Sequence, residues 1–290
     1  MKSRLDSALA ERGLAPSRTV AQALVLEGKV RVNGQVAMKS AMSVTEEDQL
    51  EVEAPPRFVS RGGEKLEGAF AAFPGWTVEG HVCLDVGSST GGFTDCLLQH
   101  GAKRVMAVDV GTNQLAWKLR ADPRVWVREN FNARYLTAAD LPECPTRAVT
   151  DVSFISLKLI LPPMAAVLAA GGEMISLIKP QFEAGRGLAP GGVVTDPAVR
   201  EQVVAEISAF GQNELGLSLR GVVESPIKGR DKGNVEYLAW CTPPRDAWNR
   251  QDRFHACSPP AASPPSPKRL FSSLSSFLLS QPTSKPTTNH

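Results

Sequence analysis

The apolar positions of the first fifty residues change from a helical spacing to an alternating one. Apolar residues recur at helical spacing over residues 5–25, and residues 29–32 then alternate between charged and apolar before Asn33-Gly34. An Asn-Gly pair behind an alternating run is a strong hairpin signal. One further short strand is expected over residues 44–52. The pattern predicts a small α+β domain over residues 1–56.

After Pro55-Pro56, short apolar runs are separated by helical stretches. Strands are expected at residues 82–85, 104–109, 125–127, 147–152, 173–178, 219–224 and 235–241, with helices from about residues 64 and 196. Strands that alternate with helices are typical of an α/β fold with a Rossmann-like, doubly wound parallel sheet. We assign this sheet to residues 64–243, behind a linker of residues 57–63. Residues 244–290 are rich in Ser and Pro, so a disordered tail is expected there.

The composition excludes several classes of protein. A chain of 290 residues with 42% hydrophobic residues can build one large and one small domain, and its net charge of +2 says little about partners. The five cysteines form no Cys-x-x-Cys pair or Cys/His cluster, which argues against disulfides and structural zinc and for a reducing, cytoplasmic location. We see no signal peptide, membrane span or metal site.

The stretch from Asp85 to Gly92 has the spacing Asp-x-Gly-x-x-x-Gly-Gly. A strand, a tight turn and a helix N-terminus are expected, where a ligand can approach bare backbone N–H groups. The spacing matches neither the dinucleotide fingerprint nor the phosphate loop. An acid before the first glycine suits a ligand with a positive end, such as S-adenosylmethionine; a purely structural turn is the alternative. The predicted cofactor-binding residues are Asp85, Gly87, Ser88, Ser89, Thr90, Gly91, Gly92, Phe93, Asp109 and Val110.

Polar residues also stand at the ends of the later strands. Because carboxyl ends of parallel strands share one rim, Asp85, Asp109, Asp151 and Lys179 are expected to lie together there. Asp109 is well placed for ribose hydroxyls, although it could instead cap a helix that begins near Asn113. Asp151 and Lys179 could equally be ordinary polar residues at strand ends.

Other charged residues leave more than one interpretation open. Lys65 begins a helix, where a lysine is usually solvated, and Glu236 stands in the mostly apolar strand of residues 235–241. The basic loop of residues 225–234 could meet RNA phosphates or be a polar turn. The N-terminal domain carries a basic set that could likewise be a solvated face: Arg4, Arg18, Lys29, Arg31 and Lys39.

The N-terminal domain resembles the S4 RNA-binding family. The similarity lies in Arg4-Leu5-Asp6, Leu14, Ser17-Arg18, Ala21, Gly28-x-Val30-x-Val32-Asn33-Gly34 and Lys39. The resemblance implies binding of structured RNA through the helix pair and the hairpin. Arg and Lys contacts to backbone phosphates give affinity without sequence readout.

An ordered series of motifs over roughly residues 1–243 resembles the TlyA family. The motifs are Val59-Ser-Arg-Gly-Gly-x-Lys65-Leu66, Asp85-Val-Gly-Ser-Ser-Thr-Gly-Gly-Phe-Thr94, Thr150-Asp-Val-Ser-Phe-Ile-Ser156, Ile178-Lys-Pro-Gln-Phe-Glu183 and Gly233-Asn-x-Glu236-Tyr-Leu238. TlyA proteins are bacterial rRNA methyltransferases with an FtsJ-like domain, and they also carry the name hemolysin. The resemblance implies S-adenosylmethionine-dependent 2′-O-methylation of cytidine in 16S rRNA, 23S rRNA or both, on ribosomal RNA or ribosomal subunits.

The same resemblance implies a Lys-Asp-Lys-Glu catalytic set. A ribose hydroxyl must be aligned with the methyl group and lose its proton, and a lysine among other cations can serve as the base. We assign this role to Lys179, with Asp151 orienting it and with Lys65 and Glu236 holding the ribose and the lysine network. The alternatives are a non-catalytic RNA-binding assembly factor and a cytolysin; the oligomeric state is left open.

Overall fold

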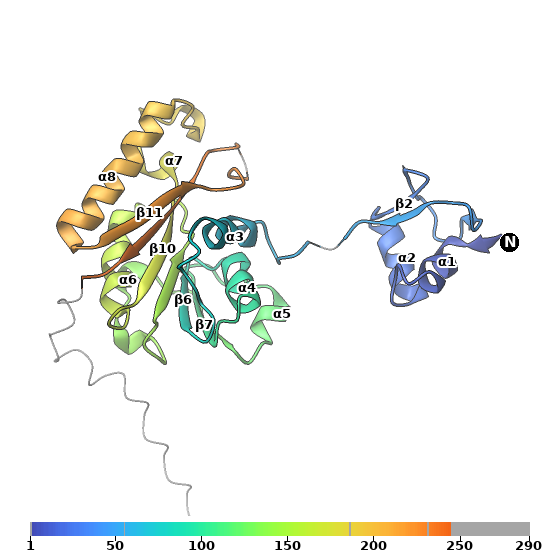
Figure 1. The fold of residues 1–290 in the computed structure, drawn as a ribbon, viewed down its shortest axis with the longest axis horizontal. Coiled ribbons are helices and arrows are strands. Elements are labelled where there is room, and N and C mark those ends of the chain that lie inside the picture. The colour runs from blue at the N-terminus through green and yellow to red at the C-terminus, as the bar shows by residue number, and fades with distance from the viewer. Residues whose placement is uncertain (1, 55, 186, 231, 245–290) are drawn as a thin grey trace, which may run out of the picture. The chain divides into compact units, whose positions relative to one another are not determined.

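The computed structural model describes residues 2–54, 56–185, 187–230 and 232–244, which form two sets of elements (Figure 1). The tail predicted for residues 244–290 lies outside the described residues except for Pro244. The buried apolar residues of the two sets form separate clusters.

The N-terminal set is an α+β unit. Its elements are β1 (Ser3–Arg4), α1 (Leu5–Glu11), α2 (Arg18–Leu26), β2 (Val30–Val32), β3 (Gln35–Val36), β4 (Ser43–Val44) and β5 (Leu50–Val52). β2 pairs antiparallel with β3 and β5, and β1 pairs with β4. Asn33 and Gly34 both have positive φ, as a two-residue hairpin turn requires. Two short strands, β4 and β5, replace the one expected over residues 44–52, because Asp48 folds residues 45–48 into a turn.

The second set is built around a seven-stranded sheet. Its strands are β6 (Val82–Val86), β7 (Arg104–Val108), β8 (Val125–Arg128), β9 (Arg147–Thr150), β10 (Glu173–Ile178), β11 (Ser218–Glu224) and β12 (Tyr237–Thr242). They lie in the order β11-β12-β10-β9-β6-β7-β8. The five strands from β10 to β8 are parallel, whereas β12 pairs antiparallel with both β10 and β11.

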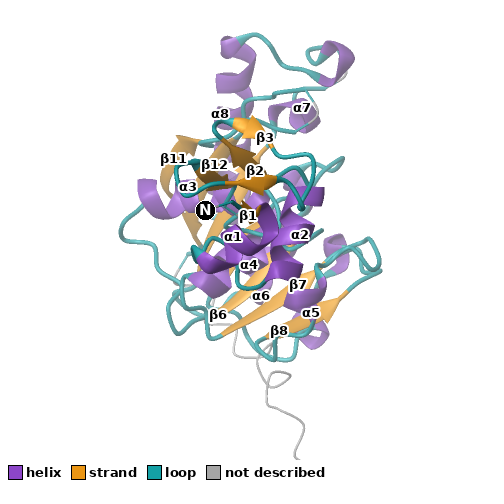
Figure 2. Ribbon diagram, turned by 90° about the vertical axis from the view of Figure 1, so that its right-hand side faces the viewer, coloured by secondary structure: helices purple, strands orange, loops and turns teal. Residues whose placement is uncertain are grey.

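Helices cover both faces of this sheet (Figures 1 and 2). The helices are α3 (Gly62–Ala72), α4 (Gly92–Gln99), α5 (Trp117–Arg120), α6 (Leu161–Val167), α7 (Pro180–Glu183) and α8 (Pro197–Leu215), with short 3-10 turns at Ala133–Tyr135, Ala138–Asp140, Leu157–Leu159 and Pro190–Gly192. α3, α4 and α5 supply Leu66, Leu97 and Leu119 to the core on one face. α6 and α8 supply Met164 and Val203 to the core on the other. The fold is thus the doubly wound α/β sheet that the sequence predicts.

The strand order reverses between β6 and β9. The chain runs outward from β6 through β7 to β8, then returns to the other side of β6 to form β9. At such a switch point the loops after the two strands diverge to opposite faces, which opens a crevice at the carboxyl ends. The glycine turn follows β6 and Asp151 follows β9, so the crevice forms between them.

Some predicted boundaries shift near this crevice. Glu236 is not inside a strand, because β12 begins only at Tyr237. The predicted strand of residues 147–152 ends at Thr150, so Asp151 stands just beyond it. Between β10 and α8 the chain forms the short helix α7 and a 3-10 turn at Pro190–Gly192.

Candidate functional site

The turn after β6 depends on glycines at two positions. Gly87 has φ +82°, and a Cβ there would stand 3.0–3.2 Å from Val152 and from the Asp151 backbone. Gly91 has φ +95°, and a Cβ there would stand 2.3 Å from a Leu119 methyl carbon. Both conformations are costly for residues with a side chain, so the turn can pack this closely against its neighbours only with glycine.

The sequence predicts bare backbone N–H groups in this turn, but several of its amides donate hydrogen bonds within the protein. The Gly87 and Ser88 amides donate to the Val108 carbonyl of β7. The Ser89 amide donates to Asp109 Oδ2 at 2.8 Å, and the Gly111 amide donates to Asp109 Oδ1 at 2.6 Å. Asp109 therefore joins the glycine turn to the loop after β7. The helix-cap alternative for this residue is wrong, since α5 begins only at Trp117.

A cleft of about 480 Å³ opens beside this turn, and we call it the glycine-turn cleft. Its wall combines the turn, the loop after β7 and apolar side chains that include Val110, Phe131 and Ile155. A smaller hollow next to it shares Gly87, Ser89, Asp151 and Ser153. All predicted cofactor-binding residues except Asp85 and Gly91 line the cleft or the hollow.

Asp85 is completely buried beneath the turn. Its Oδ2 accepts a hydrogen bond from the Thr94 hydroxyl at 2.6 Å, and its Oδ1 has no hydrogen-bond partner among the described residues. Burial raises the pKa of Asp85 to about 7, with Asp151 also raising it while Thr94 lowers it. The carboxyl therefore supports the turn from below and has an acceptor oxygen to spare.

We expect Asp85→Asn to stabilise the protein more at pH 8 than at pH 5. The unfolded chain loses this proton near the ordinary pKa of 3.8, whereas the folded chain keeps it until about pH 7. The free energy of unfolding of the wild type thus falls as pH rises between these values, by at most about 1.4 kcal/mol per pH unit. Urea unfolding at both pH values measures the difference, with the exposed Glu214→Gln as control. An equal difference at both pH values would contradict the raised pKa.

A second cleft of about 350 Å³, which we call the lysine cleft, lies beyond Ser153. Four charged side chains meet here from separate parts of the chain. Lys179 Nζ lies 2.5 Å from Asp151 Oδ1, and Lys65 Nζ lies 3.6 Å from Asp151 Oδ2 and 2.7 Å from Glu236 Oε2. Glu236, the most buried of the four, is 3% exposed. The residues form one alternating row of two cations and two anions.

Neutral side chains fix both ends of this row. Lys179 donates from Nζ to Ser153 Oγ at 2.9 Å, and Gln181 donates from Nε2 to Glu236 Oε1 at 3.0 Å. Asp151, Ser153 and Lys179 also line the hollow beside the glycine turn. Lys179 thus lines both the lysine cleft and this hollow, and the hollow shares residues with the glycine-turn cleft.

Phe154 is a feature of the site that the sequence analysis does not single out. The side chain is 89% exposed, borders both clefts, and sits on a backbone with φ +63°. Its ring centroid lies 4.9 Å from that of Phe182. An aromatic residue rarely adopts this conformation, and strained residues of this kind cluster at functional sites.

Glu183 holds the loop that presents Phe154. Its carboxylate accepts hydrogen bonds from the Ser156 hydroxyl at 2.6 Å and from the Leu157 amide at 2.7 Å. α7 thus carries both Glu183 and, at its N-terminal boundary, Lys179. The same short helix therefore anchors the loop after β9 and one end of the charged row.

The basic loop of residues 225–234 borders the lysine cleft. Arg230 and Lys232 line its wall, and the Arg61 guanidinium donates to the Lys228 carbonyl at 3.0 Å. Of the two interpretations left open for this loop, its position beside the cleft favours contact with a bound molecule.

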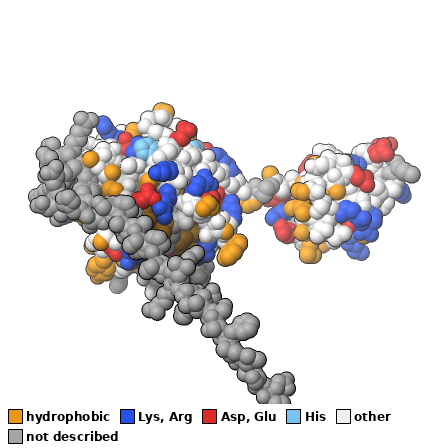
Figure 3. Space-filling view, turned by 90° about the horizontal axis from the view of Figure 1, so that it is seen from below, with side chains coloured by type: hydrophobic (Ala, Val, Ile, Leu, Met, Phe, Trp, Pro, Cys, Tyr) orange, Lys and Arg blue, Asp and Glu red, His pale blue; other side chains and the backbone are white. Residues whose placement is uncertain are grey.

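Blue Lys and Arg side chains are visible on the surface of the N-terminal unit (Figure 3). Arg4, Arg18, Arg31 and Lys39 are exposed, and Lys29 is half-buried. Arg4 and Arg18 both approach Asp6, at 2.8 Å and 3.6 Å, while their side chains remain 49% and 57% exposed. Asp6 is fully buried, and the Arg4 hydrogen bond lowers its pKa. Lys29 pairs with Glu27, and Arg31 donates to the Gly34 carbonyl. One buried carboxylate therefore holds two guanidinium groups at the surface.

The chain matches two family models, FtsJ-like methyltransferase over residues 58–242 and S4 domain over residues 3–50. It is 46% identical over 242 residues to the 16S/23S rRNA (cytidine-2′-O)-methyltransferase TlyA of Mycobacterium tuberculosis, covering 82% of this chain and 89% of that protein. The chain belongs to the TlyA family of FtsJ-like methyltransferases. Hemolysin A of Brachyspira hyodysenteriae, another relative, is 46% identical over 81% of this chain and 98% of its own.

The TlyA-family fold is also seen in a protein from Streptococcus thermophilus whose structure was described under a hemolysin name. The two share 44% identity, with a TM-score of 0.64 over 83% of this chain and 88% of that one. Among the described residues of this TlyA-family member, no helix is both long and apolar enough to cross a membrane.

The cofactor of this methyltransferase family is S-adenosylmethionine, and the residues present fit it. The apolar wall around Val110 and Phe131 suits a purine ring. Asp109 keeps lone pairs free for ribose hydroxyls, because each carboxylate oxygen can accept more than one hydrogen bond. Asp85 lies beneath the turn and lines neither the cleft nor the hollow, so its part is to support the turn from within.

Proposed function

We propose that this chain methylates the 2′-hydroxyl of a cytidine in ribosomal RNA, with Lys179 as general base. The observation that carries the proposal is the row of ion pairs at the junction of the two clefts. Lys179 lines the hollow that adjoins the glycine-turn cleft. A ribose in the lysine cleft would therefore present its hydroxyl to Lys179 and to the methyl donor together.

S-adenosylmethionine supplies an electrophilic methyl group on a positive sulfonium. Lys179 Nζ would accept the proton of the ribose 2′-hydroxyl as that oxygen receives the methyl group. Asp151, whose Oδ1 lies 2.5 Å from Lys179 Nζ, would stabilise the ammonium group that forms when Lys179 accepts the proton. Lys65, held by Glu236, fixes the other oxygen of Asp151.

Phe154 supports a nucleotide substrate. A fully exposed ring at the mouth of both clefts offers a surface on which a base can stack once its ribose enters the lysine cleft. Phe182 lies against this ring and limits its rotation. The pair would then hold the base while Lys179 and Asp151 act on the sugar.

We expect Phe154→Ala to reduce kcat/KM by about 5- to 150-fold, because base–aromatic stacking contributes roughly 1–3 kcal/mol per base. Cofactor affinity should change little. Steady-state methyl transfer at varied RNA concentration tests this. The control is Tyr135→Ala, which removes an aromatic residue that is 69% exposed on a separate turn. A wild-type rate in Phe154→Ala would show that the ring does not contact the base.

The S4 domain would supply affinity for folded RNA through Arg4, Arg18, Lys29, Arg31 and Lys39. Contacts between cations and phosphates are sequence-independent, so these residues would recruit the substrate while the clefts select the nucleotide. We place the activity in the cytoplasm, on ribosomal subunits.

The test is methyl transfer from labelled S-adenosylmethionine to isolated small and large ribosomal subunits and to free rRNA. The proposal requires label in cytidine of at least one substrate. Binding to subunits without transfer would favour a non-catalytic assembly factor, and lysis of liposomes without transfer would favour a cytolysin.

A further inference from the structure

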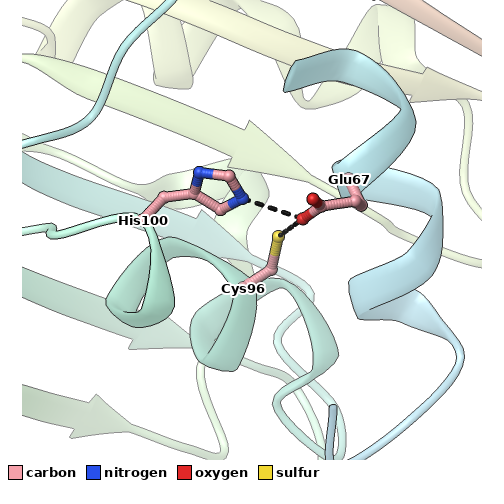
Figure 4. Close-up of side chains that lie close together, drawn as sticks. All are labelled: Glu67, Cys96 and His100. Carbon is pink, nitrogen blue, oxygen red and sulfur yellow. Dashed lines mark hydrogen bonds and ion pairs between the residues drawn. The ribbon is translucent and has the colours of Figure 1, made fainter. Parts of the chain in front are cut away.

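Glu67, Cys96 and His100 are side chains of the types that bind metals, and they form a cluster that lines neither cleft. They point toward one another from α3 and α4 (Figure 4), and one ligand atom from each lies within 4.8 Å of the others. The proposed methyl transfer uses none of them. Cys96 and His100 are four residues apart, which brings both to one face of the helical turn that ends α4.

The spacing of these atoms suits a tetrahedral ion. Cys96 Sγ lies 3.7 Å and His100 Nε2 lies 2.8 Å from Glu67 Oε2. Zinc bonds of roughly 2.0–2.3 Å place ligand atoms about 3.3–3.5 Å apart. The two distances to Glu67 Oε2 lie within about half an ångström of this range, and all three atoms lie within 4.8 Å of one another. Thiolate, imidazole and carboxylate together are the ligand types that zinc accepts.

Neighbouring groups hold two of the three side chains in position. The His100 ring stacks on Phe70 with a centroid separation of 3.6 Å and an interplanar angle of 6°. Arg57 binds the other oxygen of Glu67 at 2.8 Å, which leaves Oε2 facing Cys96 and His100. Outer contacts that orient the ligands in this way are typical of metal sites.

We propose that Glu67, Cys96 and His100 bind one Zn²⁺ ion, with water as the fourth ligand, and so fasten α3 to α4. Binding releases the Cys96 thiol proton to solvent and uses the lone pair of neutral His100. The two anionic ligands balance the charge of the ion, and Arg57 keeps its contact with Glu67. This site goes beyond the sequence analysis, which passes over the Cys96-x-x-x-His100 spacing and expects no metal.

The test is Zn²⁺ binding by the full chain after treatment with a chelator. Equilibrium dialysis should find one high-affinity equivalent in the wild type, weakened at least ~100-fold in Cys96→Ser and His100→Gln, since loss of a direct ligand costs more than loss of an outer contact. His81→Gln removes another part-buried imidazole, which contacts Thr146, and should bind as the wild type does.

The absorption spectrum of bound Co²⁺ identifies the ligand type, in addition to the affinity that dialysis measures. Co²⁺ should produce thiolate-to-metal charge-transfer absorption in the wild type and in His81→Gln, and none in Cys96→Ser. If Cys96→Ser does not fold, the partly exposed Glu67→Gln and His100→Gln carry the test, and Zn²⁺ should raise the melting temperature of the wild type but not of these two. Equal binding in the wild type and His100→Gln, or equal loss in His81→Gln, would overturn the proposal.

Discussion

Lys179→Ala is expected to reduce the rate of methyl transfer by about 10²–10⁴-fold, the usual contribution of a general base. The amine is the only proposed proton acceptor at the junction of the clefts, and Asp151 and Ser153 both hold it there. S-adenosylmethionine should still bind, because Lys179 is not among the residues that line the glycine-turn cleft. Single-turnover transfer and isothermal titration with the cofactor separate the two effects.

Lys158→Ala is the matched control for this change. Lys158 is exposed on the short turn Leu157–Leu159, which comes after the loop that follows β9. It lines neither cleft. Its replacement should leave the rate within a few-fold of the wild type. Turnover of Lys179→Ala at the level of Lys158→Ala would remove the proton acceptor from the proposed mechanism.

Glu236→Ala is expected to impair both stability and activity. Its removal leaves Lys65, 11% exposed, with Asp151 as its remaining carboxylate at 3.6 Å, and leaves Gln181 without its acceptor. Breaking a buried pair by removing one partner typically costs about 3–5 kcal/mol. Urea unfolding should show this loss, and methyl transfer should fall because Asp151 is drawn away from Lys179.

A double variant separates these two consequences. Lys65→Met with Glu236→Gln removes both charges while keeping the size of the side chains and an acceptor for Gln181. Neutral replacement of a whole buried pair is often close to neutral for stability. We expect the double variant to recover most of the lost unfolding free energy but not the activity. Recovery of both would mean that the pair only supports the fold.

The sequence predicts that Asp151 and Lys179 lie together, because the ends of the apolar runs show where the strands end. Asp151 and Lys179 each come directly after an apolar run, and parallel strands bring such positions to one rim whatever their separation along the chain. The doubly wound sheet follows from the same alternation of strands and helices. The sequence does not show that Glu236 precedes its strand, because Val235, Tyr237 and Leu238 beside it are mostly apolar and β12 begins only at Tyr237.

Other features depend on side-chain direction, which periodicity does not specify. Asp85 belongs to the glycine motif, yet it points inward to Thr94, because its strand is buried on both faces. Phe154 is 89% exposed on a backbone of positive φ, and neither property is visible in the sequence. Glu67 meets Cys96 and His100 only through the packing of α3 against α4, which sequence spacing alone does not reveal.

The most direct measurement is mass mapping of 2′-O-methyl groups on ribosomal RNA from cells with the gene, without it, and with the Lys179→Ala variant. We predict at least one cytidine whose ribose is methylated in the first strain and unmethylated in the other two. Identical rRNA methylation in all three strains would contradict ribosomal RNA as the substrate and Lys179 as the centre of the reaction.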